Sequence, residues 1–458
     1  MATTTETTTL PAAALHPPAA QAAPQAAWAL DGFDRVPRPM RPGPAPRRLR
    51  ILFLYSRPPL PMTRGDELTV SHLLEFLHAR GHEVDLLTLA SPGHRFRDGH
   101  QAWLESRCRR VRTVELGKAE GLREAALGLA RGWPFQIGYL LSRRQLAEAA
   151  AWAREGGHDL AYAYYIRSAE ALLAAAPLVP ATFMALQLSQ TLNTERLSRT
   201  AARAWERAFY RLEHARMAAY EARLWRKVSR VVLIGEKDKT AIEAACRRHG
   251  EPPIANVVWG PHGVDVERFS PRGHAAEEPG AVVMSGVMRY APNVEAALWF
   301  AGEVWPLVRR ERPDARFYLV GRDPDAKVQA LHGRDGIEVT GTVDEPADWI
   351  ARAQACVVPV RAAAGLQNKL LEALAMGRAV VATPEANEGV RAEPGRDLLL
   401  AREPDAFARA VLDLLADPGR RAALGAAGRR FVEERWTWEG PFLGLEAAFY
   451  EALQEAGR

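Results

Sequence analysis

Cysteine is scarce in this chain, which argues against a disulfide-stabilised protein and against a protein with a structural zinc site. The 458 residues include three cysteines, Cys108, Cys246 and Cys356, which are odd in number and far apart. A disulfide framework needs paired cysteines, and a structural zinc site needs cysteines or histidines at short spacings. Neither pattern is present, so we expect a reducing, cytosolic environment.

Long hydrophobic runs are lacking as well. No apolar run approaches the ~18 residues that a membrane-spanning helix requires. The N-terminus has no basic region followed by an apolar core, so we expect no signal peptide. These absences predict a cytoplasmic protein and leave open a peripheral contact with the inner face of the membrane.

A strong excess of charge is also missing. The formal net charge is +5, with 48% hydrophobic and 25% charged residues, which is ordinary for globular proteins. So mild a basic excess suits phosphate ligands or an anionic membrane as well as nucleic acid, and therefore does not identify a partner. We predict no nucleic-acid partner. The length favours two domains of similar size over a single core.

Composition divides the chain into three parts. Residues 1–48 are dominated by Ala, Pro and Thr, and a segment of this kind cannot bury enough apolar surface to offset its ordering entropy. We predict a disordered tail there, followed by one domain over residues 49–272 and a second over residues 280–436. The polar, turn-rich segment 270–280 is the predicted linker.

Both domains show alternating strands and helices. A buried-strand run over 49–55, a proline-containing loop, a helix over 67–80 and a strand over 83–89 open the first domain. A strand over 281–286 restarts the alternation in the second half. The predicted fold class is therefore α/β, with two Rossmann-like, doubly wound domains.

The loop before the first helix contains Arg64, Gly65 and Asp66. Backbone N–H groups at a helix N-terminus attract anions, and Arg64 could assist them at an acceptor or phosphate. The alternative is a capped turn with Asp66 as the helix N-cap. Taken locally, the sequence favours the capped turn.

The most informative stretch is 365–377, which lies between the apolar runs 355–360 and 379–382. Short apolar runs around a helix-length segment predict a parallel strand–helix–strand unit. Gly377 stands where a glycine commonly ends a helix. The helix N-terminus then follows the carboxyl end of a strand, where open α/β sheets bind ligands.

Helical spacing gives this segment an apolar face of leucines and places Lys369, Glu372 and Met376 on the other side. The plain interpretation is an exposed ion pair between Lys369 and Glu372, worth a few tenths of a kcal/mol, roughly 0.2–0.5. The alternative is a cation and a carboxylate that serve a binding site. The helix alone does not decide between them.

The stretch from Gly365 to Thr383, including Leu366, Gln367 and Lys369, resembles the donor-binding segment of the group 1 (family-four) retaining glycosyltransferases. The resemblance implies the GT-B fold, in which two Rossmann-like domains face a cleft. It also implies that Glu372 holds the ribose of a nucleotide sugar and that Lys369 meets the diphosphate.

Other segments of the second domain resemble the same family. Gly286 ends the first strand and would let the backbone approach a phosphate closely, and Arg289 follows it as a candidate clamp. The next strand ends at Gly321 and Arg322, a second glycine followed by a cation. Thr342 lies at the end of the strand that the resemblance places under the nucleotide base.

No cofactor or metal is expected, since the nucleotide sugar is a substrate. Asp323, Pro324 and Asp325 match by letter the DxD pattern of metal-dependent glycosyltransferases. A match beside proline is more typical of a loop turn, and we favour the turn.

The chain departs from the family pattern at three places. The family's first glutamate stands eight residues before the second, and counting back from Glu372 reaches Ala364. The usual histidine of the first domain is absent, and Arg167 and Ser168 stand near its place. His262 replaces an asparagine in a turn near the end of the first domain, where we interpret it as a turn residue.

A long helical stretch from Ala201 to Lys227 is rich in arginine and aromatic residues. An ordinary solvated helix with extended arginine side chains is the favoured interpretation. Contact with a membrane surface is the alternative.

The resemblance predicts a retaining glycosyltransferase that moves a sugar from a nucleotide donor to a hydroxyl of a glycan or lipid-linked acceptor, in bacterial polysaccharide biosynthesis. Residues 49–272 would bind acceptor, residues 280–436 donor, and residues 437–458 would cross back to the first domain. Lys369 and Arg322 would stabilise the leaving diphosphate. The alternatives are a GT-B epimerase or phosphorylase, or a non-catalytic nucleotide-sugar-binding subunit.

Overall fold

The structure is a computed structural model, and several short segments lie outside what it describes. The described residues are 45–62, 65–94, 96, 99–201, 203–260, 262–274, 276–361 and 366–457. Nearly all of the predicted tail, together with Arg64, Ala364 and Gly365, is outside them.

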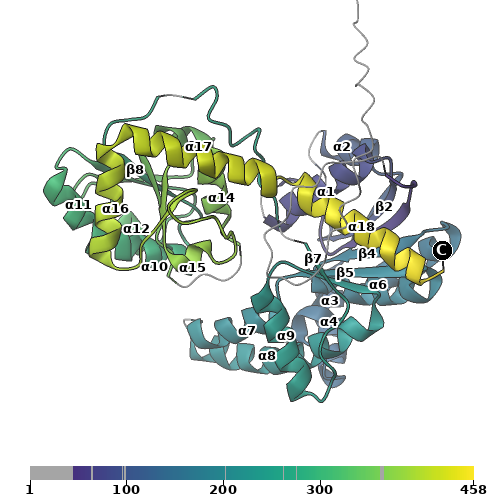
Figure 1. Cartoon of the computed structure of the whole chain (residues 1–458). Coiled ribbons are helices and arrows are strands. Elements are labelled where there is room, and N and C mark those ends of the chain that lie inside the picture. The colour runs from purple at the N-terminus through teal and green to yellow at the C-terminus, as the bar shows by residue number, and fades with distance from the viewer. Residues whose placement is uncertain are drawn as a thin grey trace, which may run out of the picture.

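The first sheet has seven strands in the order β3-β2-β1-β4-β5-β6-β7, and all neighbours are parallel (Figure 1). The central strands are buried on both faces, as their nearly continuous apolar sequences require. The strands are β1 (Arg50–Tyr55), β2 (Glu83–Ala90), β3 (Arg110–Glu115), β4 (Leu160–Tyr164), β5 (Ala181–Gln187), β6 (Arg230–Leu233) and β7 (Val257–Trp259).

Helices cover both faces of this sheet, and α7 and α8 extend away from it (Figure 1). The helices are α1 (Gly65–Ala79), α2 (His100–Arg107), α3 (Lys118–Ala130), α4 (Phe135–Tyr139), α5 (Arg143–Glu155), α6 (Ala169–Ala175), α7 (Gln190–Thr200), α8 (Ala204–Leu224) and α9 (Glu236–Arg248). Three 3₁₀ turns join them, at Ile166–Ser168, Ala176–Leu178 and Trp225–Lys227.

The second sheet has six parallel strands in the order β10-β9-β8-β11-β12-β13. They are β8 (Ala281–Ser285), β9 (Arg316–Val320), β10 (Ile337–Gly341), β11 (Ala355–Val358), β12 (Val380–Ala382) and β13 (Leu399–Leu400). The helices around this sheet are α10 (Ala291–Trp299), α11 (Trp305–Glu311), α12 (Ala326–Gln329), α13 (Pro346–Arg352), α14 (Asn368–Ala375), α15 (Pro384–Asn387), α16 (Pro404–Ala416) and α17 (Pro418–Arg435). A π-helical turn, Phe300–Val304, lies between α10 and α11.

The predicted fold class is confirmed: each half of the chain is a doubly wound parallel sheet. The strand order reverses between β1 and β4 in the first sheet, and between β8 and β11 in the second. Ligands of such sheets bind at the carboxyl ends of the strands beside this reversal. Each sheet therefore offers one preferred place for a site.

The last helix, α18 (Glu439–Glu455), returns to the first domain after α17 (Figure 1). Phe449 packs edge-on against Phe183 of β5, with ring centroids 4.8 Å apart. Glu446 is buried and accepts hydrogen bonds from Arg80 at 2.8 Å and, at the same distance, from His82. The helix is thus part of the first domain's core.

Two chain segments cross between the domains, and they lie against each other. The segment after β7 meets the one after α17, where Val264 N donates to the Trp436 carbonyl at 2.8 Å and Val264 pairs with Thr437. Gly263 packs so tightly on the Trp438 backbone that a Cβ there would overlap it. The two interdomain segments are therefore bound to each other.

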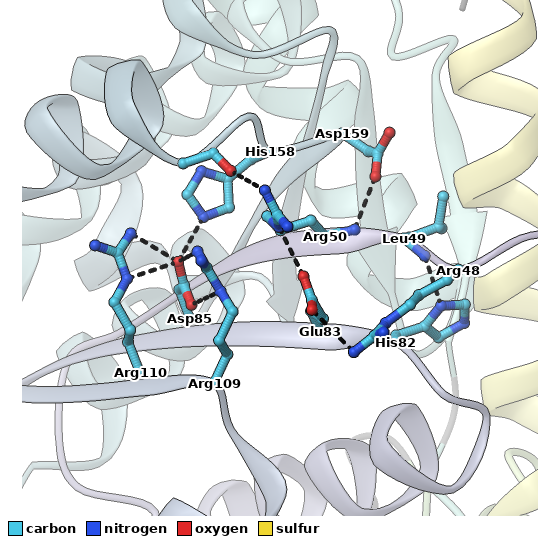
Figure 2. A network of polar contacts seen from close by, with 11 residues as sticks. Arg48, Leu49, Arg50, His82, Glu83, Asp85, Arg109, Arg110, His158 and Asp159 are labelled. Atoms are coloured by element: carbon cyan, nitrogen blue, oxygen red, sulfur yellow. Dashed lines mark hydrogen bonds and ion pairs between the residues drawn. The ribbon is translucent and has the colours of Figure 1, made fainter.

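Charged side chains tie together the amino ends of the first sheet's strands (Figure 2). The buried carboxylate of Asp85 pairs with Arg109, Arg110 and His158. Burial alone would raise the pKa of Asp85, but these hydrogen bonds outweigh burial and hold that pKa well below its usual range. The Asp85 carboxylate is engaged by three internal partners, so we assign this cluster to stability.

No helix in the described part of the chain is long and apolar enough to cross a membrane. No element was predicted for residues 91–158, which contain β3 and α2 to α5, nor for the segments that form α7 and α9. There the burial pattern of β3 is mixed, because it is an edge strand.

Deleting residues 1–48 is expected to change the free energy of unfolding by less than about 1 kcal/mol. The end of this segment contributes ion pairs of Arg47 with Asp159 and of Arg48 with Glu83, and the two arginine side chains are 48% and 66% exposed. Exposed pairs of this kind contribute little. Thermal melting of the shortened chain measures the change, and a large fall in melting temperature would refute the expectation.

Candidate functional site

The candidate site begins with glycines at the carboxyl ends of adjacent strands in the second sheet. Gly286 and Gly321 follow β8 and β9, and both have φ near +147°, which disfavours any side chain. Gly286 N donates to Val320 O at 2.9 Å, and Gly321 N donates to Gly341 O at 3.2 Å. A Cβ on Gly321 would overlap the Gly286 carbonyl. The ends of the two strands are therefore packed backbone to backbone, with no room for a side chain at either glycine.

We call Gly286 and Gly321, with the strand ends that they join, the glycine floor. Lys369 lies against this glycine floor, although it comes from the other side of the strand-order reversal. Its Cε is 3.3 Å from the position that a Cβ on Gly286 would occupy, and its Nζ donates to Gln367 Oε1 at 2.9 Å. Burial lowers the pKa of Lys369 to about 8, against the opposing effect of Glu372. The sequence placed both Lys369 and Gly286 at strand ends, and the structure brings them together.

Glu372 lies one helical turn beyond Lys369 on α14. Burial raises the pKa of its carboxyl group, while Lys369 and Arg268 favour the charged form and Glu345 opposes it. Arg268 also pairs with Glu345, with Nε 3.4 Å from the carboxylate. Glu372 thus belongs to a group of alternating charges and is not half of an isolated surface pair.

Met376 was predicted to share this face, and that prediction is wrong. Met376 is fully buried in the second domain's core. It is the C-cap residue just beyond α14, so helical spacing no longer fixes its direction. Gly377 has φ +63° and donates to the Leu374 carbonyl at 2.9 Å, which confirms it as the glycine that ends the helix.

The remaining predicted donor residues are more loosely grouped. Arg289 is exposed and pairs with Asp323, with Nε 3.5 Å from Oδ2. Arg322 and Thr342 are exposed beyond the ends of β9 and β10. The loops are joined through the backbone, since Met288 N donates to the Arg322 carbonyl at 3.0 Å. Leu366 is half-buried against the core and Gln367 is buried.

The DxD-like letters form a turn and a helix cap. Asp323 has φ +55°, and the Asp325 side chain accepts from Lys327 N at 2.9 Å at the start of α12. Within the described residues, no group of three or more His, Cys, Asp or Glu side chains could hold a metal ion. The chemistry that this edge offers is binding of an anion by a lysine and backbone N–H groups.

Asn293 is a candidate that the sequence did not single out. Its side chain is 2.9 Å from the position of a Cβ on Gly286, and its amide nitrogen donates to the Val287 carbonyl at 3.0 Å. Its Oδ1 is buried, and in the described part of the chain it has no hydrogen-bond partner. A buried acceptor left open beside Lys369 is suited to a ligand hydroxyl or amide. The sequence placed Asn293 in a loop after the strand, whereas the structure has it in the first turn of α10 with its side chain buried.

In the first domain, Asp66 lies inside the first turn of α1, because the helix already begins at Gly65. The prediction of Asp66 as the N-cap is therefore wrong. Its carboxylate accepts from the Tyr55 hydroxyl at 2.7 Å and pairs with Arg57 at 3.4 Å. These groups sit at the carboxyl end of β1, beside the reversal of strand order.

His262, predicted as a turn residue, reaches into this group. Its Nδ1 is 2.7 Å from Thr69 Oγ1 on α1. Burial lowers the pKa of His262 to about 4, and the nearby Asp66 opposes that shift only weakly. His262 is consequently a neutral imidazole at neutral pH, able to donate or accept a hydrogen bond.

Tyr165 is the strongest signal that sequence reasoning missed. It follows β4 with φ 72° and ψ 140°, a conformation that is nearly confined to glycine. Its hydroxyl accepts from Gln190 Nε2 at 3.2 Å, and the Arg167 guanidinium lies 5.3 Å from its ring centroid. Such strain is typical of functional sites. Arg167 was predicted near this place, but no residue pattern encodes a strained tyrosine.

The two candidate edges are turned toward each other. Arg196 on α7, which follows β5, donates to the Tyr290 hydroxyl after β8 at 3.0 Å. Lys237 on α9, after β6, pairs with Glu388 after α15 at 2.5 Å. All four residues follow the carboxyl ends of strands, so a ligand of one edge lies near the other.

Comparison with known families decides the nature of the second domain. The family described as Glycosyl transferases group 1 matches residues 279–417. These residues form a group 1 glycosyl transferase domain. The glycine floor, Lys369 and Glu372 all lie within this group 1 domain, whereas the Asp66 and Tyr165 groups lie outside it.

Two curated relatives extend the comparison. A GDP-mannose-dependent monoacylated alpha-(1-6)-phosphatidylinositol monomannoside mannosyltransferase of Corynebacterium glutamicum is 28% identical over 202 residues, 39% of this chain and 52% of the relative. A GDP-mannose-dependent alpha-(1-6)-phosphatidylinositol monomannoside mannosyltransferase of Mycobacterium tuberculosis is 30% identical over 214 residues, 41% of this chain and 54% of the relative. The chain thus spans about half the length of the curated relatives it matches.

Solved structures match over much more of the chain. Sucrose-phosphate synthase from Thermosynechococcus elongatus superposes with TM-score 0.60 and 18% identity, covering 89% of this chain and all (100%) of that one. Anabaena Alr3699/HepE in complex with UDP gives TM-score 0.54 and 17% identity, with 89% and 100% coverage. At such identities the likeness shows the fold, and that fold is GT-B.

Proposed function

We propose that this protein is a glycosyltransferase that moves a sugar from a nucleotide-sugar donor to a hydroxyl of a glycan or lipid-linked acceptor. The observation that carries the proposal is Lys369 lying against Gly286 inside the group 1 domain, one helical turn from Glu372. The mannosyltransferase names of the curated relatives make GDP-mannose the first donor to test and favour a lipid-linked acceptor.

The proposed chemistry follows from the charges at the strand ends. Cleavage of the sugar–phosphate bond gives an oxocarbenium-like transition state and leaves negative charge on the diphosphate. Lys369 and the N-terminus of α14 would stabilise that charge, and Arg322 would add to them. Glu372 would accept hydrogen bonds from the ribose hydroxyls. Retention of the anomeric configuration is part of this proposal.

Glu372→Gln is expected to weaken donor binding by about 1.5–3 kcal/mol, because a charged acceptor for the ribose is lost. Calorimetric titration of GDP-mannose and UDP-glucose measures this change. Glu311→Gln, at an exposed acid on α11, is the matched control and should leave binding unchanged. Wild-type donor affinity in a folded Glu372→Gln variant would end the ribose assignment.

Donor binding is expected to need no divalent cation. The diphosphate charge would be met by Lys369 and backbone N–H groups, and Asp325 is committed to capping α12. Donor affinity should therefore be the same in EDTA as in Mg²⁺. Loss of binding in EDTA with recovery on adding Mg²⁺ or Mn²⁺ would overturn this expectation.

Product analysis separates the alternatives. A glycosyltransferase releases nucleoside diphosphate only as an acceptor is glycosylated. An epimerase alters the donor sugar without acceptor, and a phosphorylase consumes phosphate or a sugar phosphate. A non-catalytic subunit would bind donor and release nothing. We place the transferase at the inner face of the membrane, in the synthesis of lipid-linked glycans or polysaccharide.

A further inference from the structure

The C-terminal end of α14 is held by one side chain of α17. The last four carbonyl groups of a helix have no partner inside it. In α14, three of them accept hydrogen bonds from the backbone N–H groups of residues 376–378. The fourth, the carbonyl of Ala375, accepts from the Arg429 guanidinium of α17, a cation at the negative end of the helix dipole. Arg429 therefore completes the end of the helix that carries Lys369 and Glu372.

Arg429 also binds the interdomain segment that follows β7. Its Nη1 donates to the Phe269 carbonyl at 2.7 Å, and its Nη2 donates to the Val266 carbonyl at 3.2 Å. Its Nε donates to Glu433 Oε1 at 2.7 Å, which fixes the plane of the guanidinium. The Arg429 side chain is 17% exposed, so these hydrogen bonds are largely shielded from water. One guanidinium thus joins α14, α17 and the interdomain segment.

Glycines of α17 bring it into close contact with the end of α14. A Cβ on Gly425 would overlap the carbonyl of Gly377, just beyond α14. A Cβ on Gly428 would lie 2.7 Å from Leu374 Cδ2, which is closer than two carbon atoms pack. After this contact, α17 leads into the second interdomain segment and α18 (Figure 1). The position of α14 is therefore tied to both interdomain segments.

The position of α14 matters for the proposed transfer. The helix has eight residues, so Lys369 lies only about 9 Å along the axis from Ala375. A tilt at one end of so short a helix displaces the other, and an error of about 1 Å at a reacting group can cost about 10²-fold in rate. We propose that Arg429 is a positioning residue, which fixes the direction of α14 and so places Lys369 and Glu372 at the glycine floor. Its effect on turnover rests on the proposed function, whereas its hold on α14 does not.

Arg429→Met removes all of these hydrogen bonds and keeps a side chain of similar length. We expect turnover, the release of nucleoside diphosphate from GDP-mannose or UDP-glucose, to fall about tenfold or more. Donor affinity, measured by calorimetry, should fall less, because Lys369 acts where charge grows in the transition state. Arg429→Lys can still donate to a carbonyl and should recover part of the turnover. A lower melting temperature with unchanged turnover of the folded Arg429→Met variant would overturn the proposal.

Arg430→Met is the matched control, since Arg430 is the next residue of α17 and is exposed. It should leave turnover and donor affinity at their wild-type values. A double-mutant cycle with Lys369→Ala shows whether Arg429 acts through α14. Arg429→Met should cost less than about threefold in turnover once Lys369 has been removed. Losses that multiply in the combined variant would contradict the positioning role.

Amide hydrogen exchange of the ligand-free protein tests the hold on α14 without any donor. Arg429→Met should speed exchange in α14 about tenfold more than in β8, and Arg430→Met should change neither. Equal exchange of α14 in the wild type and in Arg429→Met would overturn the proposal. A wild type that releases no nucleoside diphosphate would refute the proposed function instead, and the exchange measurement would still decide whether Arg429 positions α14.

Discussion

Lys369→Ala should lower turnover about 10²–10³-fold, because it removes a preorganised charge from the position where the leaving diphosphate becomes more negative. Donor affinity should fall less than turnover, since the charge in question grows in the transition state. Lys369 is suited to this role because its side chain is already held by Gln367 and the glycine floor. Steady-state release of nucleoside diphosphate in the presence of acceptor measures the effect.

The pH dependence provides an independent check. With its pKa lowered from 10.5 to about 8, Lys369 in the free protein is charged below pH 8 and becomes neutral above it. Donor affinity of the wild type should therefore decline as pH rises from about 7 to 9. Lys369→Arg keeps its charge across this range and should show no such decline. Unchanged turnover in folded Lys369→Ala, or a flat wild-type profile, would contradict the assignment.

Gly321→Ala should destabilise the protein by about 2–4 kcal/mol, the combined cost of overpacking and of positive φ for a residue with a side chain. The new methyl group would overlap the Gly286 carbonyl, and backbone cannot move aside as a flexible side chain does. Separating the two strand ends would also disturb the floor beneath Lys369. Urea unfolding, monitored by circular dichroism, gives the change in free energy.

Gly333→Ala is the matched control for this substitution. Gly333 also has positive φ, +80°, but a Cβ there would meet nothing within 4 Å. Its loss should be about 1 kcal/mol, the conformational part alone. Equal losses at Gly321 and Gly333 would show that the close approach of the strand ends contributes nothing to stability.

The sequence predicted the unit around Lys369 well because its signals are local. Two apolar runs, a helix-length segment and Gly377 determine β11, α14 and β12 within a few residues. The same reasoning placed the site at the carboxyl edge of a parallel sheet. The local pattern did not predict the contact between Gly286 and Lys369, because the two are far apart in the chain. The pairing of β8 with β11 brings them together.

The first domain was less predictable because its site is tertiary. Tyr165 takes a glycine-like conformation that its neighbours impose, and tyrosine has no local preference that reveals it. His262 looked like a turn residue until folding placed it against Thr69, from the other end of the domain. Asp66 was misplaced because the helix begins two residues earlier than predicted, and helix boundaries are what a sequence pattern defines least.

The paired crossings between the domains, joined where Val264 meets Thr437, restrict how the two halves can move. A single linker would act as a pivot, about which one domain could swivel in every direction. Two paired segments act as a hinge. Rotation of one domain about the hinge axis stays easy, whereas twisting about another axis would strain both segments. The carboxyl edges that carry Lys369 and Tyr165 would then part and meet again in the same register each time.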